Sequence, residues 1–263
     1  MENEAIQQAA EILTQLRTRT GGLGAPLADL PHDVRPSSLE DAYAIQEALR
    51  RLLSHLLGPV AGWKIGCTTR IMQAYLGIDH PCAGTLFSKQ VFEGHVQLHA
   101  SNYFKLGLEC ELAVQLTKPL GPDEDPAKAV DSVMVSVEIV DERFVDFSKC
   151  AKETLIADDF FSAGCVIAEP VSLQSLANGD DLGGLRGGFV IDGQQAAQGY
   201  GSAILGDPIA ALAWLADHRR GEGGLQAGEI VTLGSVIKTI YPQAGTHITA
   251  GFDGLGTVSV DVI

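Results

Sequence analysis

The sequence of 263 residues lacks any run near the roughly eighteen apolar residues that a membrane-spanning helix needs. Its first residues, Met1 to Glu4, also lack the basic and apolar regions of a secretory signal. Positive charge is scarce too, because 18 lysines and arginines face 33 acidic residues and leave a net charge of −15. This excess of acid argues against nucleic acid or an anionic membrane as a partner. We therefore expect a cytoplasmic protein that holds any anionic substrate with a local positive centre.

Several chemical signatures are missing as well. The cysteines form no C-x-x-C pair, and their odd number fits reduced, buried thiols better than a disulfide framework. The five are Cys67, Cys82, Cys110, Cys150 and Cys165. The glycine-rich run at 221–224 has neither the lysine of a nucleotide-binding loop nor a strand before it, and no serine-hydrolase elbow occurs. These absences argue against a disulfide scaffold, a nucleotide-binding protein and a serine hydrolase.

The N-terminal third of the sequence is typical of helices. Apolar residues at helical spacing predict helices over 5–16 and 39–56, and a Ser-Ser-Leu-Glu capping box begins the second. A short strand at 60–66 and a short helix at 68–76 follow. Together these elements predict an N-terminal helical cap region over residues 1–80, which is small enough to depend on the rest of the chain.

The remainder is mainly β-structure. Alternating patterns predict strands over 84–87, 104–116, 132–140, 188–191, 194–199, 229–233, 246–250 and 257–262. Asp192-Gly193 and Asp253-Gly254 supply hairpin turns. One clear helix interrupts the strands, with Asp207 as its cap and Pro208 in its first turn. We expect a β-rich catalytic domain over residues 81–263.

The strand at 104–116 carries two glutamates on one face. Its apolar residues alternate with polar ones, so Glu109 and Glu111 point the same way with Cα atoms roughly 6 to 7 Å apart. Two parallel carboxylates repel each other. They therefore either face open water or hold a cation between them.

A third glutamate stands alone in an apolar strand. Glu138 is the single charged residue between Ser132 and Val140, and an unpaired carboxylate buried there would cost several kcal/mol. One interpretation is a core ion pair with a lysine or arginine, with Arg143 as a candidate. The other is a divalent cation bound by Glu109, Glu111 and Glu138, for which Mg²⁺ or Mn²⁺ suits oxygen ligands better than zinc does.

Two further residues could carry chemistry. Lys64 lies in the apolar stretch Gly62-Trp63-Lys64-Ile65-Gly66, where a lysine either faces an anion or reaches the surface along its own alkyl chain. Asp79 precedes His80-Pro81 in a turn, where aspartate often serves only the backbone.

These features occur in the order of a known family. The matching stretches are 42–46, 62–66, 76–84, Glu109-Cys110-Glu111, 137–143, 156–158 and Gly234-Ser235. Together they resemble the hydratase/decarboxylase branch of the fumarylacetoacetate hydrolase superfamily. This branch includes 2-oxopent-4-enoate hydratase, 2-oxohept-4-ene-1,7-dioate hydratase and 4-oxalocrotonate decarboxylase. The resemblance covers nearly the whole chain and does not select one member.

The resemblance implies an α+β fold, a mixed β-sandwich roll with a smaller N-terminal α-containing part, in a homo-oligomer. It implies Mg²⁺ or Mn²⁺ on the three glutamates and catalytic roles for Lys64 and Asp79. It also implies substrate contacts from Ser162, Gly234 and Ser235. The chain departs from the family at 159–161, where two phenylalanines replace small residues, and we expect them to narrow the pocket.

The resemblance therefore implies a lyase of aromatic catabolism that hydrates a short 2-hydroxydienoate or its 2-oxo tautomer to a 4-hydroxy-2-oxo acid. The nearest alternative is decarboxylation of a 2-oxo-enedioate of the 4-oxalocrotonate type. A second is hydrolytic C–C cleavage of an acylpyruvate, which calls for a His/Glu pair. A third is a non-catalytic metal-binding or scaffold protein.

Overall fold

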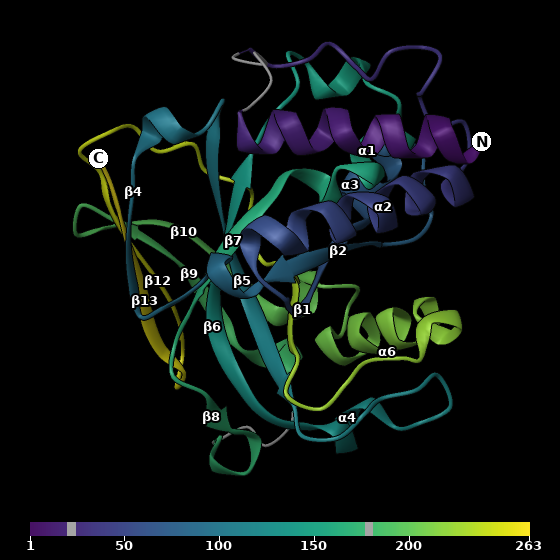
Figure 1. Ribbon diagram of the computed structural model, residues 1–263. Helices are drawn as coiled ribbons and strands as arrows, with labels where there is room; N and C mark the ends of the chain where they lie inside the picture. Colours follow the sequence, from purple (N-terminus) through teal and green to yellow (C-terminus); the bar gives the residue numbers. More distant parts are fainter. Residues whose placement is uncertain (20–24, 177–180) are drawn as a thin grey trace.

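Figure 1 shows the protein in a computed structural model that describes residues 1–19, 25–176 and 181–263. Two mixed β-sheets form its body. The larger sheet has the strand order β2-β1-β11-β5-β6-β7-β3 with β8 paired to β6, and the smaller has the order β10-β9-β12-β13-β4. The two sheets, together with the helices α1 and α2 that the N-terminal part of the chain forms, confirm the predicted α+β fold, a mixed β-sandwich roll with a smaller N-terminal α-containing part.

The helices and strands have the following bounds. The helices are α1 (Asn3–Thr18), α2 (Leu39–Leu57), α3 (Arg70–Leu76), α4 (Pro126–Ala129), α5 (Lys152–Ala157) and α6 (Pro208–His218). The strands of the larger sheet are β1 (Val60–Gly66), β2 (Cys82–Phe87), β3 (Val91–Glu93), β5 (Leu106–Leu116), β6 (Val130–Asp141), β7 (Ser162–Ile167), β8 (Val171–Ser172) and β11 (Ile230–Ser235). The smaller sheet contains β4 (His95–Leu98), β9 (Arg186–Ile191), β10 (Gln194–Tyr200), β12 (His247–Phe252) and β13 (Gly256–Val262).

The predicted long elements are confirmed, and the missed ones are short. Helix α2 is capped by Ser38, one residue later than the capping box suggests, because its Oγ accepts a hydrogen bond from the N–H of Asp41. The β9–β10 hairpin turns at Asp192-Gly193, both at positive φ as a primed turn requires. Helices α4 and α5 and strands β3, β4, β7 and β8 were not predicted. The helices span fewer than two turns, and β7 is buried along most of its length and so shows little alternation.

Helices α1 and α2 pack together (Figure 1), and α2 also packs against α5. Their apolar faces share one buried cluster with α5, β2 and the segment that carries Phe160 and Phe161. The N-terminal helices therefore support one wall of the cavity described below. The predicted division into a cap region over residues 1–80 and a catalytic domain over residues 81–263 stays a prediction. Strand β1, which belongs to the first of these regions, lies inside the larger sheet between β2 and β11. Among the described residues, no helix is both long and apolar enough to cross a bilayer.

The larger sheet is strongly curved. Lys64 lies on β1 and Glu138 on β6, with strands β11 and β5 between them. Neighbouring strands are about 4.8 Å apart, so a flat sheet would separate these two backbones by roughly 14 Å. Yet Lys64 Nζ lies 3.1 Å from Glu138 Oε1. The sheet therefore curls around the side chains of these strands, as a roll does.

Candidate functional site

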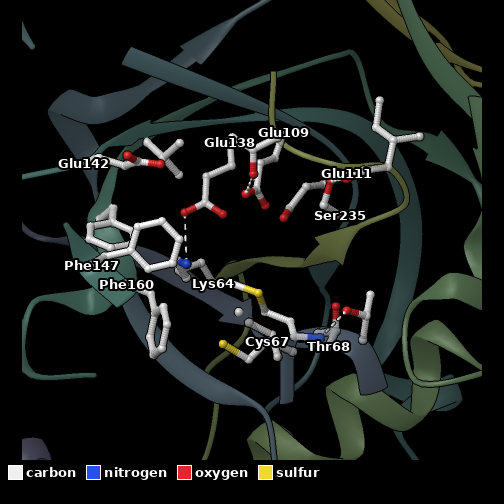
Figure 2. Close-up of a pocket in the computed structure, with 18 of the residues that line it drawn as sticks. Lys64, Cys67, Thr68, Glu109, Glu111, Glu138, Glu142, Phe147, Phe160 and Ser235 are labelled. Carbon is white, nitrogen blue, oxygen red and sulfur yellow. Dashed lines mark hydrogen bonds and ion pairs between the residues drawn. The ribbon is translucent and has the colours of Figure 1, made fainter. Parts of the chain in front are cut away.

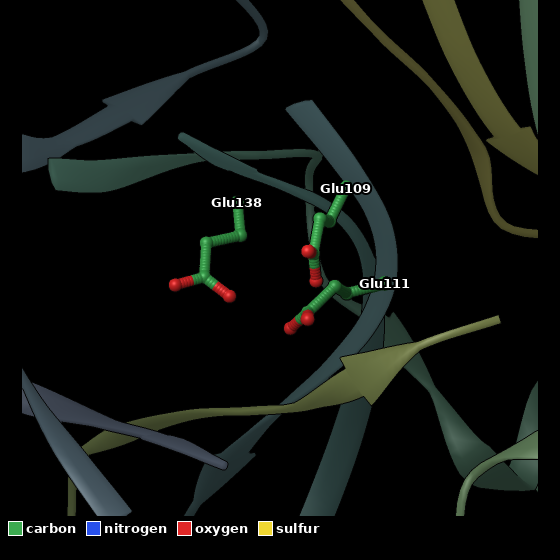
Figure 3. A group of neighbouring side chains, drawn as sticks. All are labelled: Glu109, Glu111 and Glu138. Atoms are coloured by element: carbon green, nitrogen blue, oxygen red, sulfur yellow. The ribbon is translucent and has the colours of Figure 1, made fainter. Parts of the chain in front are cut away.

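Three glutamates meet on the inner face of the curved sheet. Glu109 and Glu111 come from β5, and Glu138 lies directly opposite Glu109 on β6. Glu111 and Glu138 are each only 1% exposed, so the interpretation that these acids merely face water is wrong for them. Each of the three offers a carboxylate oxygen within 4.8 Å of the others, and Figure 3 shows the three side chains converging.

Burial and mutual repulsion disturb the titration of this cluster. Burial, and then the charges of Glu138 and Glu109, raise the pKa of Glu111 well above its usual value. Burial also raises the pKa of Glu138 to about 7, although Lys64 opposes the shift. Burial alone would lower the pKa of Lys64, but the three carboxylates reverse this effect and raise it. Lys64 therefore stays protonated through the neutral range and places a positive charge beside the three carboxylates.

The donor set fits a divalent cation. Lys64 Nζ lies 3.1 Å from Glu138 Oε1. Lys64 therefore faces an anion, and the alternative that its side chain reaches the surface is wrong. When all three glutamates are ionised, the one charge of Lys64 leaves two negative charges in the cluster without a cationic partner among the described residues. An oxygen-only set of three carboxylates is the ligand type that Mg²⁺ and Mn²⁺ prefer. The residues present therefore fit such an ion, which Glu109, Glu111 and Glu138 would bind.

Neighbouring groups fix the orientation of these glutamates. Thr239 donates a hydrogen bond from its hydroxyl to Glu109. The backbone N–H of Gly234 donates to Glu111 Oε2 at 3.3 Å. Gly234 has φ of 120°, and a Cβ there would lie 2.3 Å from the hydroxyl oxygen of Thr68, so only glycine fits. The end of β11 therefore holds one of the three glutamates in place, and the substrate contact expected of Gly234 stays a prediction.

The glutamates open into a cavity of about 180 Å³ (Figure 2). Polar residues line the end near the cluster, and apolar side chains line much of the remaining wall. The lining includes Lys64, Cys67, Thr68, Thr69, Met72, Glu142, Phe147, Phe160, Phe161, Ser235, Ile237, Thr239 and Tyr241. The phenylalanines that depart from the family pattern thus face the cavity, as expected. Sequence reasoning missed Phe147, Thr239 and Tyr241, because nothing in their local patterns marks them.

Three consecutive residues beside the cavity adopt the left-handed conformation. Asp159, Phe160 and Phe161 have φ of 52°, 48° and 67°. For non-glycine residues each such conformation costs about 1–3 kcal/mol and persists only where the surroundings impose it. Here Arg17 provides that constraint, since its guanidinium lies 3.0 Å from Asp159 Oδ2 and 3.1 Å from Asp158 Oδ1.

Arg143 belongs to the same ion network and not to the glutamate cluster. Its Nε lies 2.9 Å from Asp158 Oδ2, and its Nη2 donates to the carbonyl oxygen of Ser162 at 3.2 Å. The core ion pair considered for Glu138 therefore exists, but its partner is Lys64, and the candidate partner Arg143 is wrong. Asp158 thus pairs with both Arg17 and Arg143.

The structure separates the other predicted site residues. Ser235 lines the cavity, and its hydroxyl lies 2.7 Å from the carbonyl oxygen of Ile237. Ser162 is buried behind the wall, where its carbonyl serves Arg143. Asp79 is exposed in the segment between α3 and β2 and is not among the described residues that line the cavity. The catalytic role of Asp79 stays a prediction.

Comparison of the sequence with known proteins identifies its family and its relatives. Residues 88–263 match the fumarylacetoacetate (FAA) hydrolase C-terminal family. The chain is 32% identical over 265 residues to a 2-hydroxyhexa-2,4-dienoate hydratase of Comamonas testosteroni, covering 97% of this chain and 94% of that protein. It is 30% identical over 237 residues to a 4-oxalocrotonate decarboxylase of Pseudomonas putida, covering 87% of each.

A solved structure shows the same fold. The 4-oxalocrotonate decarboxylase of Pseudomonas putida G7, complexed with magnesium and adipate, superposes with a TM-score of 0.90 at 24% identity, over 100% of this chain and 99% of that one. The family match and the full-length relatives lead to one conclusion. The chain belongs to the FAA hydrolase family, in its hydratase/decarboxylase branch.

Proposed function

We propose that this protein is a lyase that hydrates a short 2-hydroxydienoate or its 2-oxo tautomer, of the 2-oxopent-4-enoate type, to a 4-hydroxy-2-oxo acid. The observation that carries the proposal is the cluster of Glu109, Glu111 and Glu138 at one end of a small cavity, with the Lys64 ammonium beside it. Two relatives that are 31% and 32% identical to this chain are named as hydratases of such acids, a 2-keto-4-pentenoate hydratase and a 2-hydroxyhexa-2,4-dienoate hydratase.

The polar end of the cavity suits the 2-oxo acid group. A divalent ion held by the three glutamates, Mg²⁺ or Mn²⁺, would supply Lewis-acid stabilisation of negative charge on the 2-oxygen. Lys64, which stays protonated, adds a second positive charge at the same end and orients the anionic oxygens. Both charges stabilise the dienolate formed from the 2-hydroxydienoate. Protonation of the dienolate at C5 gives the α,β-unsaturated 2-oxo acid, and water then adds its hydroxyl to C4 and a proton to C3.

The rest of the wall suits a short carbon chain. The ring of Phe161 makes edge-to-face contacts with two other phenylalanines of the wall. The centre of its ring lies 5.7 Å from that of Phe147 and 6.2 Å from that of Phe160. These rings limit the length of the substrate that the cavity accepts. We further propose that Asp79 moves a proton at the distal carbon, a role that requires its turn to approach the cavity.

Decarboxylation of a 2-oxo-enedioate is the second candidate. The likeness in fold and sequence to 4-oxalocrotonate decarboxylase supports it, and loss of CO₂ from such a diacid would form the same dienolate. C–C hydrolysis of an acylpyruvate is less well supported, since no histidine is among the described residues that line the cavity. A homo-oligomer, as the family implies, remains part of the proposal.

A spectrophotometric panel separates these activities. The purified protein is given 2-hydroxypenta-2,4-dienoate, its longer dicarboxylate homologue, 4-oxalocrotonate and an acylpyruvate, with Mg²⁺ and with excess chelator. Mg²⁺-dependent loss of the dienol with formation of the 4-hydroxy-2-oxo acid supports hydration. Release of CO₂ from 4-oxalocrotonate supports the alternative. Tight Mg²⁺ binding without turnover of any of these acids would favour the non-catalytic scaffold and contradict the proposal.

A further inference from the structure

A fourth carboxylate lies in the cavity wall away from the glutamate cluster. Glu138, Val140 and Glu142 follow one another at every second position along and just beyond β6, and all three line the cavity. Figure 2 shows Glu142 on the same side of the cavity as Glu138, near Phe147. Four residues of extended chain place the Glu142 backbone roughly 13 Å from that of Glu138. Glu142 therefore lies where the distal end of a substrate would be.

Both oxygens of Glu142 are already bound within the chain. Its Oε2 lies 2.6 Å from Lys105 Nζ, and its Oε1 accepts a hydrogen bond from the hydroxyl of Tyr241. The Lys105 ammonium also lies 3.9 Å from the centre of the Tyr241 ring. The backbone fixes this group, because the N–H of Glu142 donates to the carbonyl of Lys105 at 3.1 Å.

Lys105 and Tyr241 form the kind of site that recognises a carboxylate, an ammonium beside a hydroxyl donor. The carboxylate that fills it belongs to the protein. Glu142 is only 8% exposed, whereas the Lys105 side chain is 53% exposed, so the lysine approaches Glu142 from the solvent side. Among the described residues that line the cavity, Lys64 is the one lysine or arginine, and it is paired with Glu138.

We propose that Glu142 is a specificity-determining residue that occupies the distal carboxylate position and so makes the enzyme select monocarboxylates over dicarboxylates. The inference rests on the proposed function of the site. A diacid bound at the glutamate cluster would bring its second carboxylate against Glu142 and the phenylalanine rings. Because Glu142 already pairs with Lys105, no free cation there compensates the second carboxylate of the diacid for its loss of water.

Removal of the Glu142 carboxylate should convert this position into a binding site. In Glu142→Ala, Lys105 and Tyr241 lose their internal partner and become available to the second carboxylate of a diacid. Glu142→Gln keeps the volume but removes the charge, so its effect should be smaller. The double variant Glu142→Ala/Lys105→Met should lose the gain, because the cation is then absent. Glu93→Ala, an exposed glutamate on β3, is the matched control.

The test compares kcat/KM for 2-hydroxypenta-2,4-dienoate with that for its longer dicarboxylate homologue at saturating Mg²⁺. We expect the wild-type ratio of monoacid to diacid to be at least about a hundredfold, which is the discrimination that an unpaired buried group commonly gives. In Glu142→Ala the ratio should fall at least about tenfold, chiefly through faster use of the diacid. Glu93→Ala should keep the wild-type ratio.

Binding without turnover gives an independent readout. Adipate and hexanoate have the same chain length and differ in one carboxylate, so calorimetry with Mg²⁺ present compares their dissociation constants directly. Wild type should bind hexanoate more tightly than adipate, and Glu142→Ala should reverse this order. If wild type hydrates no substrate, the proposed function fails while this binding comparison still tests the inference.

Two results would overturn the role of Glu142. One is a wild-type enzyme that uses the diacid as well as the monoacid. The other is a Glu142→Ala protein that melts within a few degrees of wild type yet shows no gain for the diacid or for adipate. If Glu142→Ala fails to fold, Glu142→Gln serves as the test variant. In that variant, a wild-type ratio of kcat/KM for monoacid over diacid, together with wild-type adipate binding, would contradict the inference.

Discussion

Replacing Lys64 by methionine tests whether this lysine acts on the substrate or only supports the glutamates. Methionine fills a similar volume without the charge. Lys64 is 3% exposed, and its Nζ lies 3.1 Å from Glu138 Oε1, so the substitution leaves a buried carboxylate without its cation. The size of three effects, on stability, metal affinity and turnover, follows from this geometry.

The stability loss should be modest. Removing one partner of a buried ion pair costs about 3–5 kcal/mol when the other partner stays charged. Glu138 can take up a proton instead, because its pKa already lies at about 7 in the metal-free protein. Protonation near neutral pH limits the cost to about 1–2 kcal/mol. At about 2–4 °C per kcal/mol for a chain of this size, the melting temperature of the metal-free variant should fall by about 2–8 °C.

Metal affinity and turnover should respond differently. Loss of the ammonium removes a charge that repels the metal ion, but it also favours the proton that competes for Glu138. Because these effects oppose each other, the dissociation constant for Mg²⁺ should change by less than about tenfold. Turnover should fall by about 10²- to 10³-fold, as for other groups that stabilise a developing oxyanion.

The assay pairs calorimetric titration with Mg²⁺ and steady-state kinetics on the same preparations. Lys128→Met, at an exposed lysine of α4, is the control for the general effect of losing one lysine. A Lys64→Met protein that loses metal affinity and turnover to the same degree would refute the reasoning. Lys64 would then be a structural partner of the glutamates and nothing more.

Further predictions concern the cluster, its titration and the pocket. Glu138→Gln should fold but weaken Mg²⁺ binding at least about tenfold and cut turnover by orders of magnitude, and normal turnover at limiting Mg²⁺ would exclude the three-glutamate site. Burial raises the pKa of Glu111 and Glu138 in the folded, metal-free protein. The protonated glutamates therefore stabilise the fold fully at a pH below the pKa of an unfolded glutamate. This stabilisation is lost as the pH rises through the pKa in the folded protein, which is about 7 for Glu138. Thermal melts from pH 5.5 to 8 should therefore show a decline without metal that Mg²⁺ abolishes and that is smaller in Glu138→Gln. Phe161→Ala should raise kcat/KM for longer apolar 2-oxo acids relative to the five-carbon acid, and an unchanged ratio would place its ring away from the substrate. Asp79→Asn should lower kcat about a hundredfold with little change in KM if its turn reaches the substrate, whereas a loss under twofold would end its catalytic role.

The sequence predicts the ligand strands well because their pattern is local. Alternation along β5 places Glu109 and Glu111 on one face, and a single charge in an apolar strand marks Glu138 as a residue that needs a partner. Lys64 stands out for the same reason. These signals, with the family resemblance, are enough to predict the fold class and the three-glutamate cluster.

Contacts between distant segments could not be predicted in this way. The Lys64–Glu138 pair depends on the curl of a sheet across four strands, and Arg143 appeared free for Glu138 until the structure placed Asp158 against it. Likewise, Glu142 and Tyr241 are 99 residues apart in the sequence, and no local pattern joins them. The left-handed segment at 159–161 was also missed, because phenylalanine gives no signal for positive φ and a single aspartate gives only a weak one.

The central claim is that Glu109, Glu111 and Glu138 together bind the divalent ion of this active site. Crystals grown with Mn²⁺ test it most directly, because the anomalous diffraction signal of manganese distinguishes the ion from water and from lighter atoms. We expect one strong anomalous peak about 2.2 Å from a carboxylate oxygen of each glutamate, and its loss in Glu138→Gln. A peak elsewhere in the protein, or an empty cluster in crystals of an enzyme that needs Mn²⁺ in solution, would contradict it.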